Sequence, residues 1–349
     1  MVFENIQSDA FEQIIFCNDP KVGLKAIIAI HSRVLGPALG GCRMWNYTSE
    51  AEALTDVLRL SKGMTYKNSL AGLNFGGGKA VIIGNPKVDK PPGLLERFGE
   101  FVNRLGGHYI TAKDVGMSTN DLRRVKSKTS FVIGIEGDPG SSGDPSPSTA
   151  LGVYHGMRAV SKIVFHTDSL KGIKIALQGL GTVSFSLLSH LIAEGAIVTG
   201  CDIDPNAVER AVKKYGIAIV EPESIYDVSC DIFSPSALGG SINSKTLPRI
   251  KARAIAGAAN NQLATEEDGY ELMRRGLIYA PDYAINAGGV INIYYEDPIK
   301  HTFDKNKSIE HTSRIYQTII DILERAQAEK QPTHLIANRM ALERIARGH

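Results

Sequence analysis

Residues 173–202 read IKIALQGLGTVSFSLLSHLIAEGAIVTGCD, and this stretch decides the fold. An apolar run leads into the string GLGTVS at 179–184, and a helical pattern follows. The first glycine permits a tight turn, and the second lets the backbone approach a pyrophosphate at a helix N-terminus. The next apolar run ends at Asp202, 21 residues after Gly181. Strand, glycine turn, helix and acid in this register predict a dinucleotide-binding unit.

The acid at the end of the second strand bears on the choice of dinucleotide. Asp202 can accept hydrogen bonds from both hydroxyls of an adenosine ribose, and its charge would repel a 2′-phosphate. We therefore expect NAD rather than NADP. Asp204, which precedes Pro205, fits better as the cap of the following helix. Ser184 stands where glycine or alanine is usual, but serine is small enough for close helix–strand packing.

Short apolar runs rich in β-branched residues recur along the second part of the chain. They do not alternate with polar residues, which is typical of strands buried on both faces. Segments with helical patterning or turn chemistry lie between most of them. We therefore expect an α/β fold with a doubly wound parallel sheet covered by helices. The six runs lie at 173–177, 196–200, 217–220, 230–233, 254–258 and 277–280.

The chain has 349 residues, which is enough for about two domains. A linker-like stretch at 134–147, GIEGDPGSSGDPSP, has no apolar periodicity and divides it. In the first part, apolar runs at 26–30 and 80–83 predict strands. Ser49 with Glu52 three residues later indicates the start of a helix between them.

Two further segments have a helical pattern. One is amphipathic, carries apolar residues between 94 and 105, and stops at a pair of glycines. The other is the final stretch, 309–347.

Composition and charge argue against several classes of protein. The chain has 39 basic and 37 acidic residues, whereas a nucleic-acid-binding protein normally has a strongly basic surface. No apolar run approaches the ~20 residues of a membrane-spanning helix, and the first residues lack the basic start of a signal peptide. We therefore expect a cytoplasmic protein that binds neither nucleic acid nor membrane. The scattered cysteines and histidines indicate buried, reduced thiols and no metal site.

Residues 63–84, GMTYKNSLAGLNFGGGKAVIIG, carry two lysines of interest. Lys79 follows three glycines, which let backbone segments pack closely, and precedes a predicted buried strand. A lysine in such a setting, beside a second cation, can act as a base near neutral pH, because burial and like charge both favour its neutral form. A solvated surface position is the alternative for Lys79 and for Lys67.

Two other segments carry candidate polar groups. An apolar run at 108–114 ends in Asp114, which is either a turn former or the carboxylate of a proton-transfer pair with a lysine. Spacing alone leaves open whether the two side chains meet. Residues 258–263, AANNQL, follow a predicted strand with Asn260 and Asn261. These amides either form a polar turn or face a nicotinamide or a substrate.

Together these strings resemble the glutamate/leucine/phenylalanine/valine dehydrogenase family, and most closely its leucine-specific members. The likeness runs from about residue 36 to about residue 345. The matching strings are GPALGG at 36–41, KGMTYK at 62–67, GGGK at 76–79, TAKDVG at 111–116, SSGDPSPSTA at 141–150, AANNQL at 258–263 and APDYAINAGGVIN at 280–292.

The resemblance implies a mixed-sheet catalytic domain and a Rossmann NAD-binding domain, with the active site in the cleft between them. It also implies a C-terminal helix that returns to the first domain. On this basis the catalytic domain comprises residues 1–135 and a helix at about 325–349, and the NAD-binding domain comprises residues 136–324. Members of the family are oligomers, so we expect a homo-oligomer, either a dimer or an octamer.

By the same resemblance, Lys79 would be the catalytic base and Asp114 its acid/base partner. Lys67 would bind the substrate α-carboxylate, and Thr149 would bind the nicotinamide carboxamide. The residues expected at the substrate are Leu39, Gly40, Lys67, Ala112, Asn261, Val290 and Ile293. Those expected at the cofactor are Thr149, Gly179, Leu180, Gly181, Thr182, Val183, Ser184, Asp202, Ile203, Ala237 and Asn260.

Substrate class follows from three of these positions. Leu39 stands where glutamate-specific relatives have a lysine, and burying a side-chain carboxylate against leucine would be costly. Relatives acting on aromatic amino acids tend to have glycine at Ala112 and leucine at Val290. The resemblance therefore implies NAD-dependent, reversible oxidative deamination of L-leucine, L-valine or L-isoleucine to the 2-oxo acid and ammonia. One methylene is worth only ~1–3 kcal/mol, so the sequence does not rank these three.

Two alternatives stay open. One is an aromatic L-amino-acid dehydrogenase of the same family, acting on phenylalanine or tryptophan. The other is a non-catalytic NAD-sensing protein, whose signature would be loss of Lys79 or Asp114, and both are present.

The sequence also departs from the leucine-specific pattern at three positions. Lys113 stands in place of glutamate, Thr182 in place of asparagine and Ser184 in place of alanine. None of these changes removes a predicted catalytic group.

Overall fold

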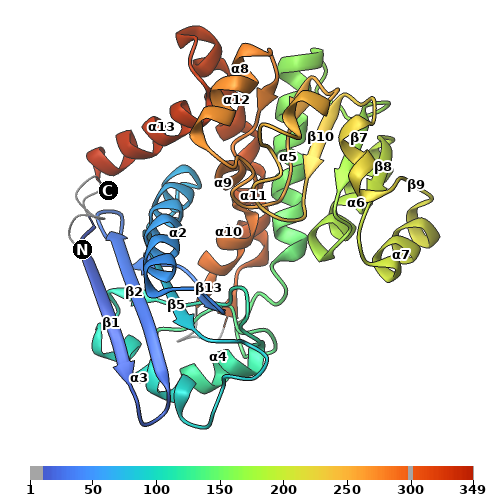
Figure 1. The fold of residues 1–349 in the computed structure, drawn as a ribbon. Helices are drawn as coiled ribbons and strands as arrows, with labels where there is room; N and C mark the ends of the chain where they lie inside the picture. The colour runs from blue at the N-terminus through green and yellow to red at the C-terminus, as the bar shows by residue number, and fades with distance from the viewer. Residues whose placement is uncertain (1–10, 298–301, 349) are drawn as a thin grey trace. The chain divides into compact units, whose positions relative to one another are not determined.

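The computed structural model describes residues 11–297 and 302–348, and its contacts divide the chain into two compact units (Figure 1). Unit 1 comprises Met1–Gly143, Tyr295–Asp304 and Ala341–His349, and unit 2 comprises Asp144–Tyr294 and Lys305–Met340.

These limits differ from the sequence-based ones at three places. The first boundary lies after Gly143 and not after residue 135, Tyr295–Asp304 belongs to unit 1, and residues 325–340 belong to unit 2. The linker up to Gly143 stays with unit 1, because the Glu296 carboxylate accepts hydrogen bonds from the backbone N–H groups of Gly134 and Ser142, at 3.0 and 2.7 Å. At the other end, residues 325–340 stay with unit 2, because the helix that contains the first of them packs on the long helix that follows the linker.

Unit 1 is built on a six-stranded mixed sheet in the order β1-β2-β5-β3-β6, with β4 also paired to β5. β2 is antiparallel to β1 and β5, whereas β3 and β4 run parallel to β5. This confirms the mixed sheet expected for the first domain. The strands are β1 (Gln13–Asp19), β2 (Leu24–Ser32), β3 (Ala38–Leu39), β4 (Cys42–Trp45), β5 (Gly76–Ile83) and β6 (Tyr109–Ile110).

Helices cover both faces of this sheet. α2 (Glu50–Leu70) packs its apolar side on Ile27 and Val81, and α3 (Leu94–Arg104) and α4 (Thr119–Lys126) pack on the opposite face. Ser49 caps α2 as predicted, since its hydroxyl accepts the Glu52 N–H at 3.1 Å. The Glu52 carboxylate binds the backbone and hydroxyl of Thr48 instead of returning to Ser49.

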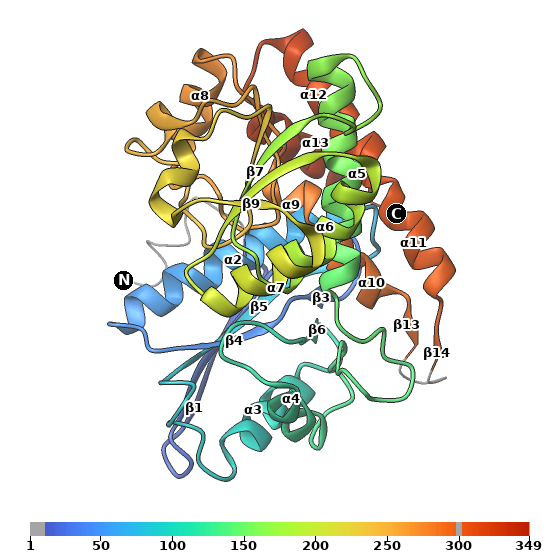
Figure 2. The ribbon, with the colours of Figure 1, turned by 90° about the vertical axis from the view of Figure 1, so that its right-hand side faces the viewer.

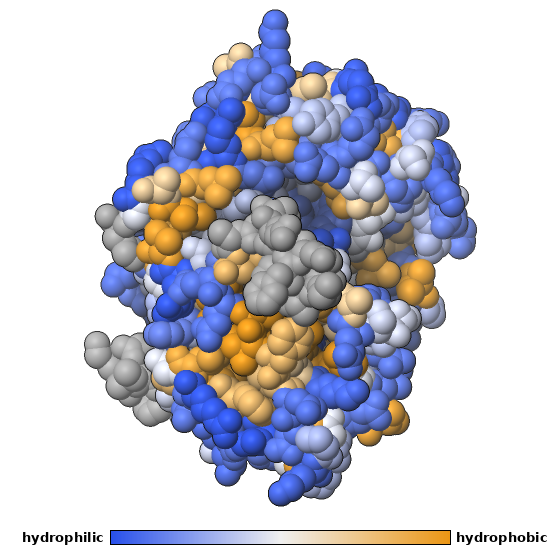
Figure 3. All heavy atoms as spheres, turned by 60° about the vertical axis from the view of Figure 1, so that its left-hand side comes forward, coloured by the Kyte–Doolittle hydropathy of each residue, from blue (hydrophilic) through white to orange (hydrophobic). Residues whose placement is uncertain are grey.

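The outer edge of the unit 1 sheet is formed by β1. Among the described residues β1 pairs only with β2, so its other edge has no strand beside it. Phe16 projects from β1 with 55% of its surface exposed. Figure 3 shows apolar side chains gathered on this side of the molecule, below the atoms drawn in grey.

Unit 2 contains a six-stranded parallel sheet in the order β12-β11-β10-β7-β8-β9. All six runs predicted as strands contribute to it, which confirms the doubly wound fold. Successive strands lie on opposite sides of β7, and ligands bind such sheets at this switch point. The strands are β7 (Lys174–Gln178), β8 (Ile197–Cys201), β9 (Ala218–Ile219), β10 (Ile232–Pro235), β11 (Ala254–Ile255) and β12 (Ile278–Tyr279).

The helices of unit 2 surround this sheet (Figure 2). The long helix α5 packs against α6 and α12, and the short helices η1 and η2 share a core with α8 and the strands. The helices are α5 (Ser146–Phe165), α6 (Thr182–Glu194), α7 (Pro205–Tyr215), η1 (Pro222–Asp227), η2 (Leu247–Arg249), α8 (Glu266–Arg274), α9 (Asp282–Ile285), α10 (Gly288–Tyr294), α11 (Lys305–Ser313) and α12 (Ile315–Glu329).

The C-terminal stretch forms three helices, α11, α12 and α13 (Thr333–Arg347). A short hairpin of β13 (Glu296–Asp297) and β14 (Thr302–Phe303) precedes them. The boundary between the units falls within α13. In unit 1, the guanidinium of Arg344 donates to the backbone carbonyl of Ser69 at 3.0 Å, so the last turns of α13 are tied to the end of α2.

All four cysteines are buried and free of disulfides, as the sequence predicted. Burial raises the pKa of Cys201 and of Cys230 to about 11, so both thiols are protonated at neutral pH. No helix in the described part of the chain is long and apolar enough to cross a membrane.

Candidate active site

Lys79 lies inside strand β5, not ahead of it as the sequence suggested. The glycines before it are part of the same strand and fit the tight packing around it. A Cβ on Gly77 would overlap the backbone of Thr65 in α2, and one on Gly78 would come within 2.8 Å of the Tyr109 ring. Only glycine lets α2 and the Tyr109 ring of β6 approach β5 this closely. Lys79 is consequently buried, with 6% of its surface exposed.

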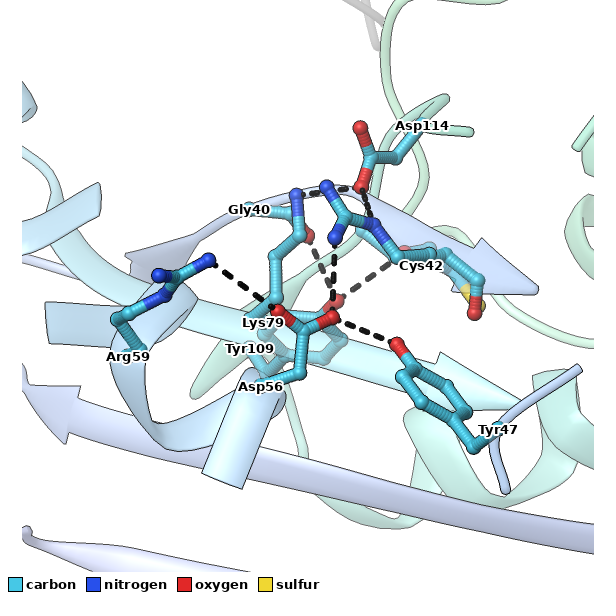
Figure 4. A network of polar contacts seen from close by, with 10 residues as sticks. Gly40, Cys42, Tyr47, Asp56, Arg59, Lys79, Tyr109 and Asp114 are labelled. Atoms are coloured by element: carbon cyan, nitrogen blue, oxygen red, sulfur yellow. Dashed lines mark hydrogen bonds and ion pairs between the residues drawn. The ribbon is translucent and has the colours of Figure 1, made fainter. Parts of the chain in front are cut away.

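Lys79 meets Asp114, which settles the question that spacing left open. The Lys79 Nζ lies 2.8 Å from the Asp114 Oδ2 (Figure 4). Strand β6 ends at Ile110, earlier than predicted, and the chain then runs beside β4. The Cys42 N–H donates to the Ala112 carbonyl at 2.9 Å, and the Met44 N–H donates to Val115 in the same way. These backbone hydrogen bonds hold Asp114 opposite β5.

Arg43 joins the same carboxylate, and sequence reasoning missed it. Its Nε donates to the Asp114 Oδ2 at 3.1 Å, and its Nη1 donates to Asp56 Oδ2 at 2.9 Å. The Tyr47 hydroxyl donates to the same Asp56 oxygen at 2.7 Å. The signal for Arg43 was a single arginine within the short strand CRMW, directly after the GPALGG string. Asp56 lies on α2, and only the fold brings it there.

The ionisation of Asp114 is set by competing effects. Burial raises the pKa of Asp114, and the charges of Lys79 and Arg43 lower it. The two cations prevail, so the pKa of Asp114 lies below its ordinary value. Asp114 is therefore an anion at neutral pH, fixed between two positive side chains.

The other predicted substrate residues of unit 1 lie in the same sheet, beside its strands or in α2. Leu39 and Gly40 leave β3, where Leu39 pairs with Ile110, and the Gly40 N–H donates to the Ile110 carbonyl at 3.2 Å. Leu39 and Ala112 are both buried. Lys67 lies in the last turn of α2 and is half-buried.

The predicted nucleotide loop connects β7 to α6. Gly179 has a left-handed backbone with φ of +92°, and Gly181 is the N-cap of α6. The Leu180 N–H donates to the Asp202 Oδ2 at 2.6 Å, so the carboxylate lies against the glycine turn. Asp204 caps α7, as expected, by accepting the Asn206 N–H at 3.0 Å.

The residues at the start of α6 leave room for a dinucleotide and suit its negative charge. No side chain caps the N-terminus of α6, and its first turn contains no acidic residue, so its N–H groups suit a pyrophosphate. A Cβ on Gly181 would meet nothing within 4 Å, so the space before the helix is open. Ala237 lies beside Gly179, and Ile203 is 89% exposed next to Asp202.

The predicted amides follow β11. Asn261 has a left-handed backbone with φ of +52°, and its N–H donates to the Asp282 Oδ2 at 2.5 Å. Asn260 is exposed, and its side-chain oxygen accepts from the Asn286 amide at 2.8 Å. Asp282 and Asn286 were not singled out from the sequence, although both lie in the matching string at 280–292. They hold the amide loop in place.

The remaining predicted residues of unit 2 lie around α10. A Cβ on Gly288 would overlap the Ser148 carbonyl, and one on Gly289 would lie 2.7 Å from the Thr149 Oγ1. Helix α10 therefore starts directly against Thr149. Val290 and Ile293 are three residues apart on α10, so they share one face of the helix, and both are half-buried.

The predicted site residues are thus divided between the units. Unit 1 contains Lys67, Lys79 and Asp114, together with the apolar residues predicted at the substrate. Unit 2 contains the glycine loop, the amide loop and α10. In the described parts of the chain, no three His, Cys, Asp or Glu side chains come together as a metal site would require.

Two family models match the chain. Residues 11–131 match the model of the Glu/Leu/Phe/Val dehydrogenase dimerisation domain, and residues 204–349 match the glutamate/leucine/phenylalanine/valine dehydrogenase model. The chain belongs to this family. It is 49% identical over 345 residues to leucine dehydrogenase of Bacillus cereus, covering 99% of this chain and 93% of that one. It is 46% identical over 344 residues to phenylalanine dehydrogenase of Caldalkalibacillus thermarum, covering 97% and 92%.

Solved structures give the same result. The crystal structure of L-tryptophan dehydrogenase from Nostoc punctiforme superposes with a TM-score of 0.87, at 41% identity and over 99% of both chains. The hetero-hexameric glutamate dehydrogenase of Thermus thermophilus, 20% identical, shares the fold with a TM-score of 0.77 over 100% of this chain and 94% of that one. The chain is therefore an amino-acid dehydrogenase, an oxidoreductase of a family that uses nicotinamide dinucleotides.

We predict that Arg43 fixes the ionisation of Asp114. In Arg43→Met one of the two cations is lost, so the pKa of Asp114 should rise and the acid limb of the kcat/KM–pH profile should move to higher pH. A shift of one pH unit corresponds to about 1.4 kcal/mol. The free energy of unfolding should fall at neutral pH, and the difference from wild type should shrink as the pH drops through the pKa of Asp114.

Two variants control this measurement. Arg43→Lys keeps the positive charge and should restore most of the profile. Arg59→Met removes an exposed arginine that lies 3.9 Å from Asp56 only, and should leave the profile unchanged. An unmoved acid limb in Arg43→Met, with turnover intact, would contradict the role.

Proposed function

We propose that this enzyme catalyses the NAD-dependent, reversible oxidative deamination of a branched-chain L-amino acid, leucine, valine or isoleucine, to its 2-oxo acid with release of ammonia. The observation that carries the proposal is the buried contact of 2.8 Å between Lys79 and Asp114, with the apolar side chains of Leu39 and Ala112 near it in the same sheet. A lysine–carboxylate pair of this kind can move protons, and aliphatic walls suit an aliphatic side chain.

In this reaction the substrate α-carboxylate pairs with Lys67. NAD, when bound at the glycine loop, would supply the acceptor for the hydride of the substrate α-carbon. Lys79 would activate the water that attacks the resulting imine carbon, so that a C–O bond forms, the C=N bond becomes a C–N bond and the water proton passes to the Lys79–Asp114 pair. Asp114 then moves protons between Lys79 and the substrate nitrogen, the C–N bond breaks, and ammonia and the 2-oxo acid leave. One water is consumed and one hydride passes to NAD. The ammonium form of the amino acid then gives the 2-oxo acid, ammonium and one further proton, so the deamination balances.

The cofactor preference is argued from Asp202. Its carboxylate is held at the glycine turn by the Leu180 N–H, where a dinucleotide in a Rossmann unit presents its adenosine ribose. A 2′-phosphate would bring a second negative charge to this carboxylate, which favours NAD over NADP. The relatives named leucine dehydrogenase and phenylalanine dehydrogenase support an apolar amino acid as the substrate. The choice of an aliphatic substrate over an aromatic one rests on Leu39, Ala112 and Val290.

Assembly is the third part of the proposal. We propose that the chain forms a homo-oligomer through the free edge of β1. An unpaired edge strand is a template for another chain, and Phe16 adds exposed apolar surface there. The family model that covers this unit is described as a dimerisation domain.

The substrate and cofactor are tested by initial rates of NADH or NADPH formation at mildly alkaline pH. The panel comprises L-Leu, L-Val, L-Ile, L-Phe, L-Trp and L-Glu, each with NAD and with NADP. We expect an aliphatic amino acid to give the highest kcat/KM and NAD to exceed NADP by at least about tenfold, which is ~1.4 kcal/mol of repulsion. A dominant aromatic rate would keep the chemistry and overturn the reading of Ala112 and Val290, and a preference for NADP would overturn that of Asp202.

Lys79→Ala tests the base. Loss of a general base lowers rates by about 10²–10⁴-fold, so we expect kcat to fall in that range. NADH should bind with unchanged affinity in a fluorescence titration, because Lys79 and the glycine loop belong to different units. Lys87→Ala, which removes an exposed lysine just after the same strand, is the matched control. Near-wild-type turnover in Lys79→Ala would refute the assignment.

Phe16→Lys tests the assembly. Placing a charge on the free edge of β1 should lower the molar mass measured by light scattering after size exclusion, since charged edge residues oppose strand pairing. Val88→Lys, at a position in unit 1 that is 74% exposed and off the sheet edge, should leave the mass unchanged. A monomeric wild type, or an oligomer that both variants leave intact, would show that β1 is not the interface.

A further inference from the structure

Unit 2 contains a cavity of about 600 Å³ that the proposed reaction does not use. It lies between α8, the start of β12 and the C-terminal ends of α5 and α12. Leu272, Leu277 and Leu323 form part of its apolar wall, and each has less than a tenth of its surface exposed. Its volume falls within the roughly 300–1,000 Å³ of ordinary ligand pockets.

This cavity is separate from the predicted cofactor loop. Arg253 immediately precedes β11 and Leu277 immediately precedes β12, so the cavity lies at the N-terminal ends of these parallel strands. The glycine loop follows β7, and Asn260 follows β11, at the C-terminal ends. A ligand in the cavity would therefore lie at the N-terminal ends of the strands, and the dinucleotide would lie at their C-terminal ends.

The ionisable side chains that line the cavity are basic, apart from the Tyr279 hydroxyl. Arg253 and Lys330 line the cavity together with His166, and no aspartate or glutamate does. None of these three side chains forms an ion pair with a described residue. Arg253 is held in place, because it donates to the Val164 carbonyl at 2.8 Å and stacks on Phe165 at 4.8 Å.

The chain conformation places two of these groups at the rim. His166 and Lys330 are the C-caps of α5 and α12, and both have left-handed backbones, with φ of 59° and 52°. Glycine is the usual residue in this conformation. Here each position instead carries a side chain with a nitrogen that can bind an anion.

Apolar walls and unpaired positive groups together select the ligand class. An inorganic anion would leave the leucines unused, and a hydrocarbon would leave the two cations without a partner. We propose that the cavity binds an aliphatic carboxylate, with its chain against the leucines and its carboxylate at Arg253 and Lys330.

The cavity is also connected to the amide loop at 258–263 within unit 2. Tyr279 lines it, and the Tyr279 hydroxyl donates to the Asp282 Oδ1 at 2.9 Å. The other oxygen of Asp282 accepts the Asn261 N–H at 2.5 Å. A ligand that moves Tyr279 therefore acts on the amide loop through two hydrogen bonds. This regulatory part of the inference rests on the proposed dehydrogenase reaction, whereas binding itself does not.

Binding is tested by calorimetric titration of decanoate into the full-length protein saturated with NADH, so that the nucleotide loop is filled. We expect one saturable site per chain. Affinity should fall at least tenfold in Arg253→Gln/Lys330→Gln, and by a smaller factor in the single variant Lys330→Gln. It should also fall at least tenfold in Met273→Trp, which places a larger side chain in the lining of the cavity. Lys171→Gln/Lys213→Gln removes two exposed lysines elsewhere in unit 2 and should bind as wild type does.

Two results would overturn the binding site. One is no saturable binding of decanoate to the wild type, and the other is equal binding by Met273→Trp and the wild type. Neutral 1-octanol should bind at least tenfold more weakly than octanoate, and equal binding of the two would show that the cations play no part.

Coupling is tested separately with Tyr279→Phe, which keeps the ring and removes the hydroxyl. In the wild type, saturating decanoate should change the KM for the amino acid at least twofold. In Tyr279→Phe decanoate should still bind, within about threefold of the wild-type affinity, and the change in KM should disappear. An unchanged wild-type KM would overturn the coupling. A wild type without any dehydrogenase activity would instead refute the proposed function and leave the binding result standing.

Discussion

The contact between Lys79 and Asp114 is the interaction on which the candidate site depends. Breaking a buried ion pair by removing one partner costs about 3–5 kcal/mol, because the other charge is left without compensation. The structure balances this pair with a second one, since Arg43 bridges Asp114 and Asp56. Two cations and two carboxylates therefore alternate in one chain of contacts. The Tyr47 hydroxyl donates a further hydrogen bond to the last carboxylate, that of Asp56. This arrangement keeps Asp114 ionised while it is largely removed from water.

The same constraint explains the glycines around the pair. A lysine can be buried beside its partner only if β3, β5 and α2 approach closely, and side chains on Gly77 or Gly78 would prevent this. The glycines weaken β5 as an isolated strand, since glycine in a strand interior is destabilising. The cost is offset by the mixed sheet, in which β5 is paired with β2 along one side and with β3 and β4 along the other.

Local signals were enough to predict much of this fold. The six strands of unit 2, the cap at Ser49 and the position of Asp202 beside the glycine turn all follow from residues within one or two elements. The missing parts depend on contacts between distant segments. Arg43 and Asp56 are 13 residues apart and meet only because β4 and α2 both contact β5, and a single arginine in a strand has no pattern of its own. Asp282 and Asn286 were missed for the same reason, because they support the amide loop from a different helix and turn.

The N-terminal and C-terminal ends of the strands in the unit 2 sheet border different groups, and β12 connects the two ends. Its N-terminal side borders the cavity, and Tyr279 at its C-terminal side reaches Asp282 and the amide loop. Among the described residues, three non-glycine positions have left-handed backbones: Asn261 at the loop, and His166 and Lys330 at the cavity. Such conformations cost of order 1–3 kcal/mol for most side chains, and less for asparagine. Glycine would relieve the strain at the two helix ends, but it would also remove both nitrogen-bearing side chains from the cavity rim. The sequence therefore accepts strain where those side chains meet an otherwise apolar cavity, which is the pattern expected of a ligand site and not of a simple packing defect.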